Sequence, residues 1–269
     1  MNNRGLNFVQ FAVGGRVYPS LAEWTRLTER FRGAAIKDLC RRISKGDAKR
    51  YEDLSEEQRE NVRLFAGKDR TGTPLKGHAH TYFALWPDED GLPTRLIAFR
   101  TTPFTQQEIQ ALWEASDSPI GWGTGDGEES WKVRLVALPE QTPLPRTFVG
   151  PARKWESVTP FVPPTTRFRF RSNGRERLGE TPERLVTKLL ESMGRPAPAT
   201  VRRLDSSESW LKLHATRERR RQVIATRTPF VRPGFRLQMV FSEPVRGPLI
   251  IGDSSHFGLG LFRTGNDEN

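Results

Sequence analysis

The sequence predicts an α+β fold built from two tandem lobes, and three features of the chain support this prediction. Short apolar segments alternate with amphipathic ones in a similar order in both halves of the sequence. A proline-rich stretch that contains Pro143, Pro145 and Pro151 separates the two halves. A chain of 269 residues is also too long for one minimal module. We therefore expect an N-terminal lobe over residues 1–142 and a C-terminal lobe over residues 152–269.

The first half begins with an apolar segment over residues 6–13, which predicts a buried strand. A long amphipathic helix is expected over residues 20–43, because apolar residues recur there every three to four positions after a capping-box sequence. A short second helix should begin at Ser55 and end near Gly67. The remaining elements are a pair of strands joined by an Asp-Glu-Asp-Gly turn, then a helix, then a last strand, over residues 78–86, 94–100, 105–115 and 131–138.

The second half repeats this order more loosely. Thr181 should cap a helix that runs to residue 193, because Pro182 then occupies the first turn, where its missing N–H has no helical partner. Strands are expected over residues 158–162, 200–204, 210–214, 235–241 and 258–262. The first half then follows the order β-α-β-β-α-β with a helical insert, and we expect the second half to be a looser version of the same β-α-β-β-α-β lobe. This is the order of the ferredoxin-like (RRM-like) fold, which single-strand RNA readers also use.

Positive charge is concentrated in the second half of the chain. The formal net charge is +11; residues 1–150 carry 21 Lys and Arg against 20 Asp and Glu, whereas residues 151–269 carry 22 against 12. Most of the basic residues are arginine, whose guanidinium binds phosphate oxygens in pairs and stacks on bases. The balance therefore favours a nucleic acid over a membrane surface as the partner. A basic surface kept for solubility is the alternative.

Other classes of protein are disfavoured by what the sequence lacks. No apolar run approaches the length of a membrane span, and the N-terminus shows no signal-peptide pattern. Cys40 is the only cysteine, which excludes a disulfide framework and a thiolate zinc site, and four histidines leave few ligands for a metal centre. We therefore expect a cytoplasmic protein with neither a metal nor a small-molecule cofactor.

A glycine-rich loop near the C-terminus is the first candidate for binding. Gly252, Gly258 and Gly260 lie between or beside two apolar runs, and glycine lets a phosphodiester approach main-chain N–H groups that a Cβ would shield. Ser254 and Ser255 in the same loop could donate hydrogen bonds to a non-bridging phosphate oxygen. An ordinary bulge or tight turn is the alternative.

Two arginine-rich segments are the next candidates. Arginine and phenylalanine alternate over residues 167–171, so an extended segment would place arginine on one face and phenylalanine on the other. A second cluster occupies residues 217–221. Such segments suit an RNA backbone, and a basic loop without fixed structure is the alternative. The arginines that we assign to RNA binding are Arg167, Arg169, Arg171, Arg219, Arg220 and Arg221.

The histidines are candidates for acid–base chemistry. His78 and His80 are two residues apart on an expected strand, so their side chains would lie on the same side of it. Imidazole titrates near neutrality and can take a proton from a ribose 2′-OH or protonate a leaving oxygen. His256, inside the glycine loop, could contact the phosphate or transfer the second proton. A metal-binding pair and histidines bonded to nearby carbonyls are the alternatives, and for His214 we favour a structural role.

These features together resemble a known family. The glycine-rich segment over residues 252–262, the sequence His-Ala-His-Thr-Tyr-Phe over 78–83 and the two ferredoxin-like halves are similar to CRISPR-associated repeat-RNA endoribonucleases of the RAMP superfamily. The similarity is to the RNA-processing half of the fused subunit from type I-G (formerly I-U) systems. Gly-Lys-Asp at 67–69 and Trp-Glu-Ser-Val-Thr-Pro at 155–160 fit the same pattern.

The resemblance implies a function. Such proteins cut the repeat of a CRISPR transcript without metal, by attack of the 2′-OH, and leave a 2′,3′-cyclic phosphate and a 5′-OH end. Many then remain on the guide RNA as a subunit of a type I interference complex. Family members commonly carry the catalytic histidine on or beside the first helix, and residues 20–43 contain none, so His78, His80 or His256 would have to act. A non-catalytic RNA-binding subunit and a basic protein–protein scaffold are the alternatives.

Overall fold

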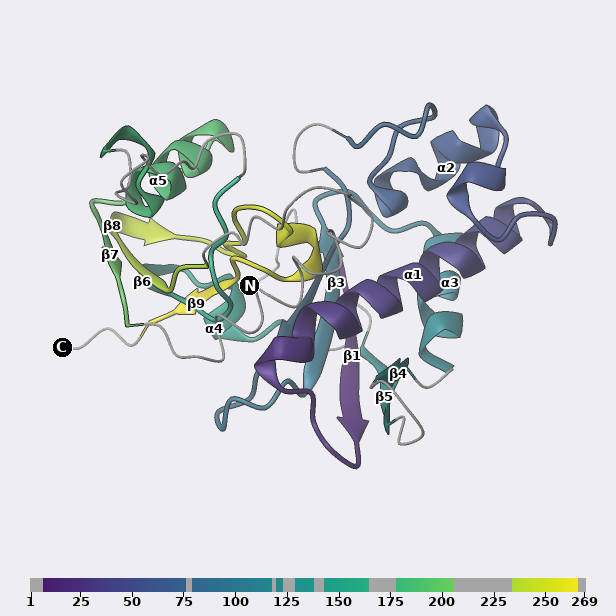
Figure 1. Cartoon of the computed structure of the whole chain (residues 1–269), viewed down its shortest axis with the longest axis horizontal. Coiled ribbons are helices and arrows are strands. Elements are labelled where there is room, and N and C mark those ends of the chain that lie inside the picture. The colour runs from purple at the N-terminus through teal and green to yellow at the C-terminus, as the bar shows by residue number, and fades with distance from the viewer. Residues whose placement is uncertain are drawn as a thin grey trace, which may run out of the picture. The chain divides into compact units, whose positions relative to one another are not determined.

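The computed structural model describes residues 7–75, 79–117, 120–122, 129–137, 143–164, 178–205 and 234–265. The chain forms two compact units, one made of Met1–Ser20 and Arg26–Pro143 and the other of Leu21–Thr25 and Leu144–Asn269. Each unit contains one antiparallel sheet (Figure 1). No helix among the described residues is long and apolar enough to cross a membrane.

The first unit has the strand order of a ferredoxin-like lobe. Its strands are β1 (Asn7–Gly15), β2 (Tyr82–Trp86), β3 (Arg95–Arg100), β4 (Ile120–Trp122) and β5 (Glu129–Ala137). They pair in the order β2-β3-β1-β5-β4. The main connecting helices are α1 (Trp24–Ile43), which follows η1 (Leu21–Glu23), and α3 (Gln106–Asp117). The predicted β-α-β-β-α-β order is confirmed, and β4 is an addition that the sequence pattern did not reveal.

The insert between α1 and β2 carries η2 (Tyr51–Asp53) and α2 (Glu56–Ala66). Ser55 and Gln58 form the expected capping box at the start of α2, and Gly67 ends the helix with a φ of 71°. The hydroxyl of Tyr51 donates a hydrogen bond to the carbonyl oxygen of Asp69, which ties the turn after α2 back to η2. The helix expected between Ser55 and Gly67 is therefore confirmed.

Aromatic side chains join the helices of this unit to one face of the sheet. The ring of Phe31 on α1 packs edge-on against Phe11 of β1 and Phe83 of β2, with centroids 4.9 and 6.1 Å apart. Phe65 of α2 packs against the same Phe83 at 6.1 Å. Such edge-to-face contacts add specific geometry to the burial of large apolar surfaces. They place α1 and α2 on the same face of the sheet.

The other face of this sheet is mainly apolar as well. The strand register places Phe8, Phe99 and Tyr82 in one row across β1, β3 and β2, with Gln10, Ile97 and Ala84 in the next row. These six side chains are at most 4% exposed. Burial on both faces explains why β2 reads as a continuous apolar run and shows no alternation.

The second unit has the same strand order as the first. Its strands are β6 (Ala152–Ser157), β7 (Thr200–Arg203), β8 (Leu237–Val245) and β9 (Phe262–Thr264). They pair in the order β7-β8-β6-β9, so the first strand of the lobe lies between its third and fourth. The helices are α4 (Arg146–Val149), η3 (Leu178–Glu180), α5 (Pro182–Ser192) and η4 (Ser255–Phe257). The α+β fold of two tandem ferredoxin-like lobes is thus confirmed.

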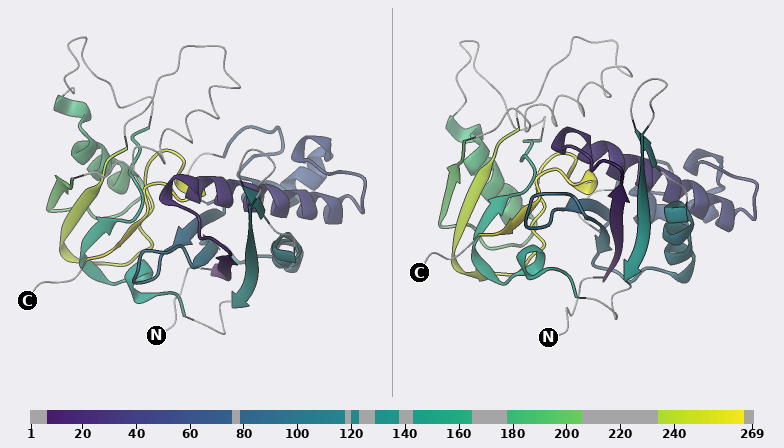
Figure 2. Two further views of the ribbon diagram at one scale, coloured as in Figure 1. Left: turned by 60° about the horizontal axis from the view of Figure 1, so that its bottom comes forward. Right: turned by 90° about the horizontal axis from the view of Figure 1, so that it is seen from below.

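The glycine-rich loop replaces the second helix of this lobe. Where the order β-α-β-β-α-β predicts a helix between β8 and β9, the chain forms a loop with the single short turn η4. Leu249 and Ile251 of the loop are buried in the same core as Leu185 of α5 and Trp155 of β6. The loop and α5 therefore cover the same face of the sheet (Figure 2).

Two strand predictions in the second half are wrong. The strand expected over residues 158–162 lies earlier, at β6, because Ala152–Ser157 is the segment that pairs with both β8 and β9. Residues 158–162 contact the glycine loop; the N–H of Val158, for example, donates to Leu261 at 2.7 Å. The last strand begins at Phe262 and not at residue 258, because residues 258–260 form a turn.

The strand expected over residues 78–86 begins later than the sequence predicts. β2 begins only at Tyr82, because the N–H of Thr81 donates to the carbonyl of Leu64 on α2 at 2.9 Å and not to a neighbouring strand. His80 therefore lies outside the strand, and side-chain alternation does not place it beside His78. Residues 76–78 lie outside the described part of the chain, as do the strand expected over 210–214 and the arginine-rich segments over 167–171 and 217–221.

Candidate functional site

The glycine loop between β8 and β9 is folded onto the segment that follows β6. The N–H of Asp253 donates to the carbonyl of Val162 at 2.8 Å, and the N–H of Gly260 donates to that of Pro160, also at 2.8 Å. Within the loop, the N–H of Ile251 donates to Gly260 at 2.9 Å. Much of the main chain that the sequence offered as a phosphate cradle is thus hydrogen-bonded inside the lobe.

Close packing explains why glycine occupies two of the loop positions. A Cβ at Gly260 would lie 1.8 Å from the carbonyl oxygen of Ile251, and a Cβ at Gly252 would lie 2.6 Å from that of Val162. Both residues have positive φ, 64° and 102°, which disfavours any side chain. These glycines therefore let the loop fit against its own lobe, whereas the sequence suggested that they open the main chain to a ligand.

Two more glycines make room for Trp155, the largest side chain of this core. A Cβ at Gly150 would lie 3.0 Å from its indole ring, and one at Gly247 would lie 2.6 Å from it. The indole N–H donates to the carbonyl of Ala152 at 3.0 Å. The start of the glycine loop is therefore packed against a fixed aromatic side chain.

Thr159, for which the sequence indicated no role of its own within the segment 155–160, holds the other end of the loop by hydrogen bonds. Its side chain is buried, its hydroxyl donates to the carbonyl of Gly258 at 2.6 Å, and the same oxygen accepts the N–H of Leu261 at 3.0 Å. One side chain therefore satisfies two main-chain groups of the loop. A threonine that follows a strand gives no sequence signal for this role, because the partners lie about a hundred residues away.

We expect Thr159→Val to destabilise the second lobe by about 2–3 kcal/mol, because it leaves a buried carbonyl and a buried N–H without a partner. Thr159→Ser keeps the hydroxyl and is the matched control, with an expected loss of about 1 kcal/mol for the missing methyl. Urea unfolding of the two variants measures the difference. Equal losses would show that the hydroxyl does not hold the loop.

The polar side chains of the loop differ in accessibility. Ser254 and Ser255 are 4% and 7% exposed, and the hydroxyl of Ser254 lies 3.3 Å from a carboxylate oxygen of Asp253. His256 is half-buried, and its ring lies against that of Phe257 with centroids 4.0 Å apart. Of the polar side chains proposed from the sequence in this loop, His256 is the most accessible.

His80 belongs to the first unit, where neighbouring side chains fix its ring. The imidazole is stacked on Tyr82, with centroids 5.0 Å apart and an interplanar angle of 15°. Tyr82 in turn is stacked on Phe99 at 5.3 Å. A Cβ on Gly67 would lie 3.7 Å from the imidazole, so the end of α2 lines the other side of the ring. His80 is therefore a half-buried imidazole held in one orientation.

Cys40 is not a candidate nucleophile. Burial, together with the nearby carboxylates of Glu52 and Asp53, raises the pKa of its thiol to about 11. At neutral pH the sulfur is therefore protonated, and a thiol in that state is a poor nucleophile. Within the described ranges, no group of three or more His, Cys, Asp and Glu side chains is arranged to hold a metal ion.

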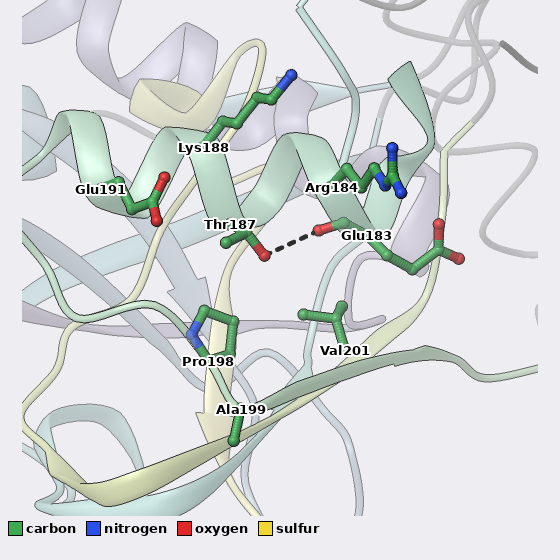
Figure 3. A pocket seen from close by; sticks show the side chains of 8 residues that line it. All are labelled: Glu183, Arg184, Thr187, Lys188, Glu191, Pro198, Ala199 and Val201. Carbon is green, nitrogen blue, oxygen red and sulfur yellow. Dashed lines mark hydrogen bonds between the residues drawn. The ribbon is translucent and has the colours of Figure 1, made fainter. Parts of the chain in front are cut away.

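A groove of about 450 Å³ lies between α5 and β7 (Figure 3). Burial acts to raise the pKa of Glu183 in its wall, but the hydrogen bond from Arg203, 2.5 Å long, holds that pKa below its ordinary value. None of the sequence-predicted site residues is among those that line the groove, which are Glu183, Arg184, Thr187, Lys188, Glu191, Pro198, Ala199 and Val201.

The chain matches no protein-family model and no curated protein. Three solved structures resemble it at low similarity. A CRISPR-associated protein Cas6 has 9% sequence identity and a TM-score of 0.39, over 97% of this chain and 100% of that one. A RAMP protein that binds different RNA substrates has 11% identity and a TM-score of 0.36, over 97% and 99%. A Cas6 product complex has 15% identity and a TM-score of 0.40, over 96% and 98%.

Proposed function

We propose that the chain binds RNA and acts as a metal-independent endoribonuclease on CRISPR repeat RNA. The observation that carries the proposal is the charge of the second half, where 22 Lys and Arg stand against 12 Asp and Glu. This excess belongs to a lobe with the strand order of RNA-reading ferredoxin-like folds. The resemblance to RAMP endoribonucleases adds the substrate class, and it also suggests retention on the guide RNA within a type I interference complex.

The proposed chemistry needs two proton transfers and no cofactor. A neutral imidazole, from His78 or His80, takes the proton of the ribose 2′-OH, and the freed oxygen attacks the adjacent phosphorus. The bond from phosphorus to the 5′ oxygen breaks, and that oxygen receives a proton from an acid, with His256 assisting at the phosphate. The products are a 2′,3′-cyclic phosphate and a 5′-OH end. The fixed ring of His80 and the accessible ring of His256 support these roles.

Histidine variants test this mechanism. We expect His78→Ala or His80→Ala, whichever removes the base, to slow cleavage about a hundredfold, and His256→Ala to slow it less. The assay uses the CRISPR repeat RNA of the same genome in the presence of EDTA, with the new ends mapped. His214→Ala is the control and should cleave at the wild-type rate. Wild-type rates for all three other variants would refute the histidine mechanism.

One observation favours the non-catalytic alternative. α1 (Trp24–Ile43) contains no histidine, although relatives in the family that the sequence resembles commonly carry the catalytic one on or beside this helix. An RNA-binding subunit without activity would show no cleavage, yet its affinity would still fall steeply with salt as counterions are released. A basic scaffold for an acidic protein would show neither cleavage nor RNA binding.

A further inference from the structure

The two lobes share a strand order, but the sheet faces that point away from their helices are chemically different. In the first lobe the described side chains of this face are mainly apolar, with Phe8, Phe99 and Tyr82 in one row across the strands. In the second lobe the corresponding face is polar. Because the strand arrangement is the same, the difference comes from the side chains alone. It selects the second lobe as the one whose sheet can contact a charged ligand.

The strand register defines this polar face. Directly paired residues of antiparallel strands point to the same side, and Val201, Met239 and Trp155 form the row that faces the core under α5. The neighbouring residues on each strand therefore point the other way. They form one row across β7, β8, β6 and β9 that consists of Arg202, Gln238, Glu156 and Arg263. We call this row and its neighbours Thr200, Val240 and Lys154 the polar sheet face.

The arginines of the sheet fall into two groups. Arg203 of β7 is on the α5 side, where it is bonded to Glu183, and Arg153 of β6 has a carboxylate of Glu243 at 3.6 Å. Arg202 and Arg263 are exposed, and within the described residues neither forms an ion pair. These two are the arginines of the polar sheet face. The strand arginines that lack an acidic partner thus lie in the same cross-strand row, at its two ends.

The middle of the row is organised differently. The side-chain amide of Gln238 donates to Glu156 at 2.5 Å, and the ammonium of Lys154 lies 3.7 Å from the same carboxylate. The negative charge of Glu156 is therefore balanced by neighbouring side chains of the same face. The formal charges of the face sum to an excess of two positive charges, carried by the outer arginines.

We propose that the polar sheet face of the second lobe binds the backbone of single-stranded RNA, with Arg202 and Arg263 as its phosphate contacts. This inference rests on the RNA-binding function proposed above and adds a surface that lies on the other side of the sheet from the glycine loop. The two arginines are separated by three strand spacings, about 14 Å, a distance that spans two or three nucleotides of an extended strand. RNA crosses the four strands of an RRM sheet on a similar scale.

The binding mode differs from that of an aromatic RNA platform. The polar sheet face offers two exposed guanidinium forks but no aromatic ring among its seven side chains, and the amide of Gln238 is buried and bonded to Glu156. Affinity should therefore come from phosphate contacts, which are independent of base identity and sensitive to salt. The face is suited to holding a flanking single strand, whichever sequence is recognised elsewhere in the protein.

The test compares two double variants of the full chain. Arg202→Gln with Arg263→Gln removes the proposed contacts, and Arg184→Gln with Lys188→Gln removes the same charge from exposed positions of α5. Binding of fluorescently labelled oligouridylate is measured by anisotropy over a range of salt concentrations. We expect the first variant to bind at least tenfold more weakly and to reduce the salt slope by about 1.4, since each phosphate contact contributes about 0.7. The control variant should retain nearly wild-type affinity.

The outcomes separate this inference from the function on which it rests. If the wild-type chain binds RNA but the two double variants lose the same amount of affinity, the polar sheet face is not the site, and the RNA-binding function still stands. A wild-type chain that binds neither oligouridylate nor repeat RNA would overturn both proposals. Circular dichroism of the variants checks that the substitutions, all at exposed positions, leave the fold unchanged.

Discussion

Gly260→Ala should lower the free energy of unfolding by about 3–5 kcal/mol, because it forces apart two segments of the second lobe. The added Cβ would lie 1.8 Å from the carbonyl oxygen of Ile251, a distance that no side-chain rotation can relieve. The main chain would have to move and break the bonds that Gly260 makes with Ile251 and Pro160. Because the loop completes the core in place of a helix, the damage should reach the whole lobe. Urea unfolding followed by tryptophan fluorescence, to which Trp155 of this lobe contributes as one of seven tryptophans, measures the loss.

Gly194→Ala is the matched control for this prediction. Gly194 lies in the same lobe with a φ of 68°, close to the 64° of Gly260, and a Cβ there would meet no atom within 4 Å. The control therefore carries only the cost of a left-handed alanine, about 1–2 kcal/mol. The difference between the two variants isolates the clash with Ile251. Equal losses would mean that the loop can move away from Ile251 at little cost.

Glu108→Gln is expected to cost about 3–5 kcal/mol in the first lobe, because it leaves a buried guanidinium without its counter-charge. Arg100 and Glu108 are 2% and 3% exposed and form two hydrogen bonds of 2.7 and 2.6 Å. The guanidinium also donates to Thr102 and Pro103, while Glu108 accepts the N–H of Thr105 in the capping box of α3. Removal of one charge therefore disturbs β3, the turn after it and the start of α3 together.

Two comparisons make this prediction specific. Glu60→Gln breaks an exposed ion pair, in which the side chains of Arg63 and Glu60 are 42% and 52% exposed. This change should cost no more than about 0.5 kcal/mol. The double change Arg100→Met with Glu108→Leu removes both buried charges and should restore part of the stability that Glu108→Gln loses. Thermal unfolding of the four proteins measures these differences. A double variant less stable than Glu108→Gln would contradict the account based on an unpaired charge.

Local sequence patterns predicted the helices better than the strands. The capping box at Ser55 and the proline after Thr181 mark the starts of α2 and α5 correctly, because a cap is satisfied within one turn of the chain. The strand expected to start before Tyr82 begins only there, because the N–H of Thr81 bonds to Leu64 of α2, a contact that the local pattern does not show. A segment forms a strand only where another strand pairs with it, and the apolar periodicity of a sequence does not identify that second strand.

In the candidate site, too, the sequence showed the residue types but not the long-range contacts that explain them. Glycine in the C-terminal loop was visible in the sequence, but the reason for it was not, because Gly260 fits against Ile251 and Gly252 against Val162 only once the loop is folded back. Arg202 and Arg203 are equivalent in the sequence. The register of β7 separates them, since one faces α5 and bonds to Glu183 while the other points away from it.

The sequence by itself determined the α+β class, the order of the main elements in the first half, the excess of positive charge in the second half and the small supply of metal ligands. These depend on composition and on periodicity within short windows. Only the tertiary structure decided that the glycine loop packs into the core of its own lobe, that one sheet presents a mainly apolar face and the other a polar face, and which arginines lack an acidic partner among the described residues. Those properties depend on which strands pair and in what register, and such pairing joins residues far apart in the chain.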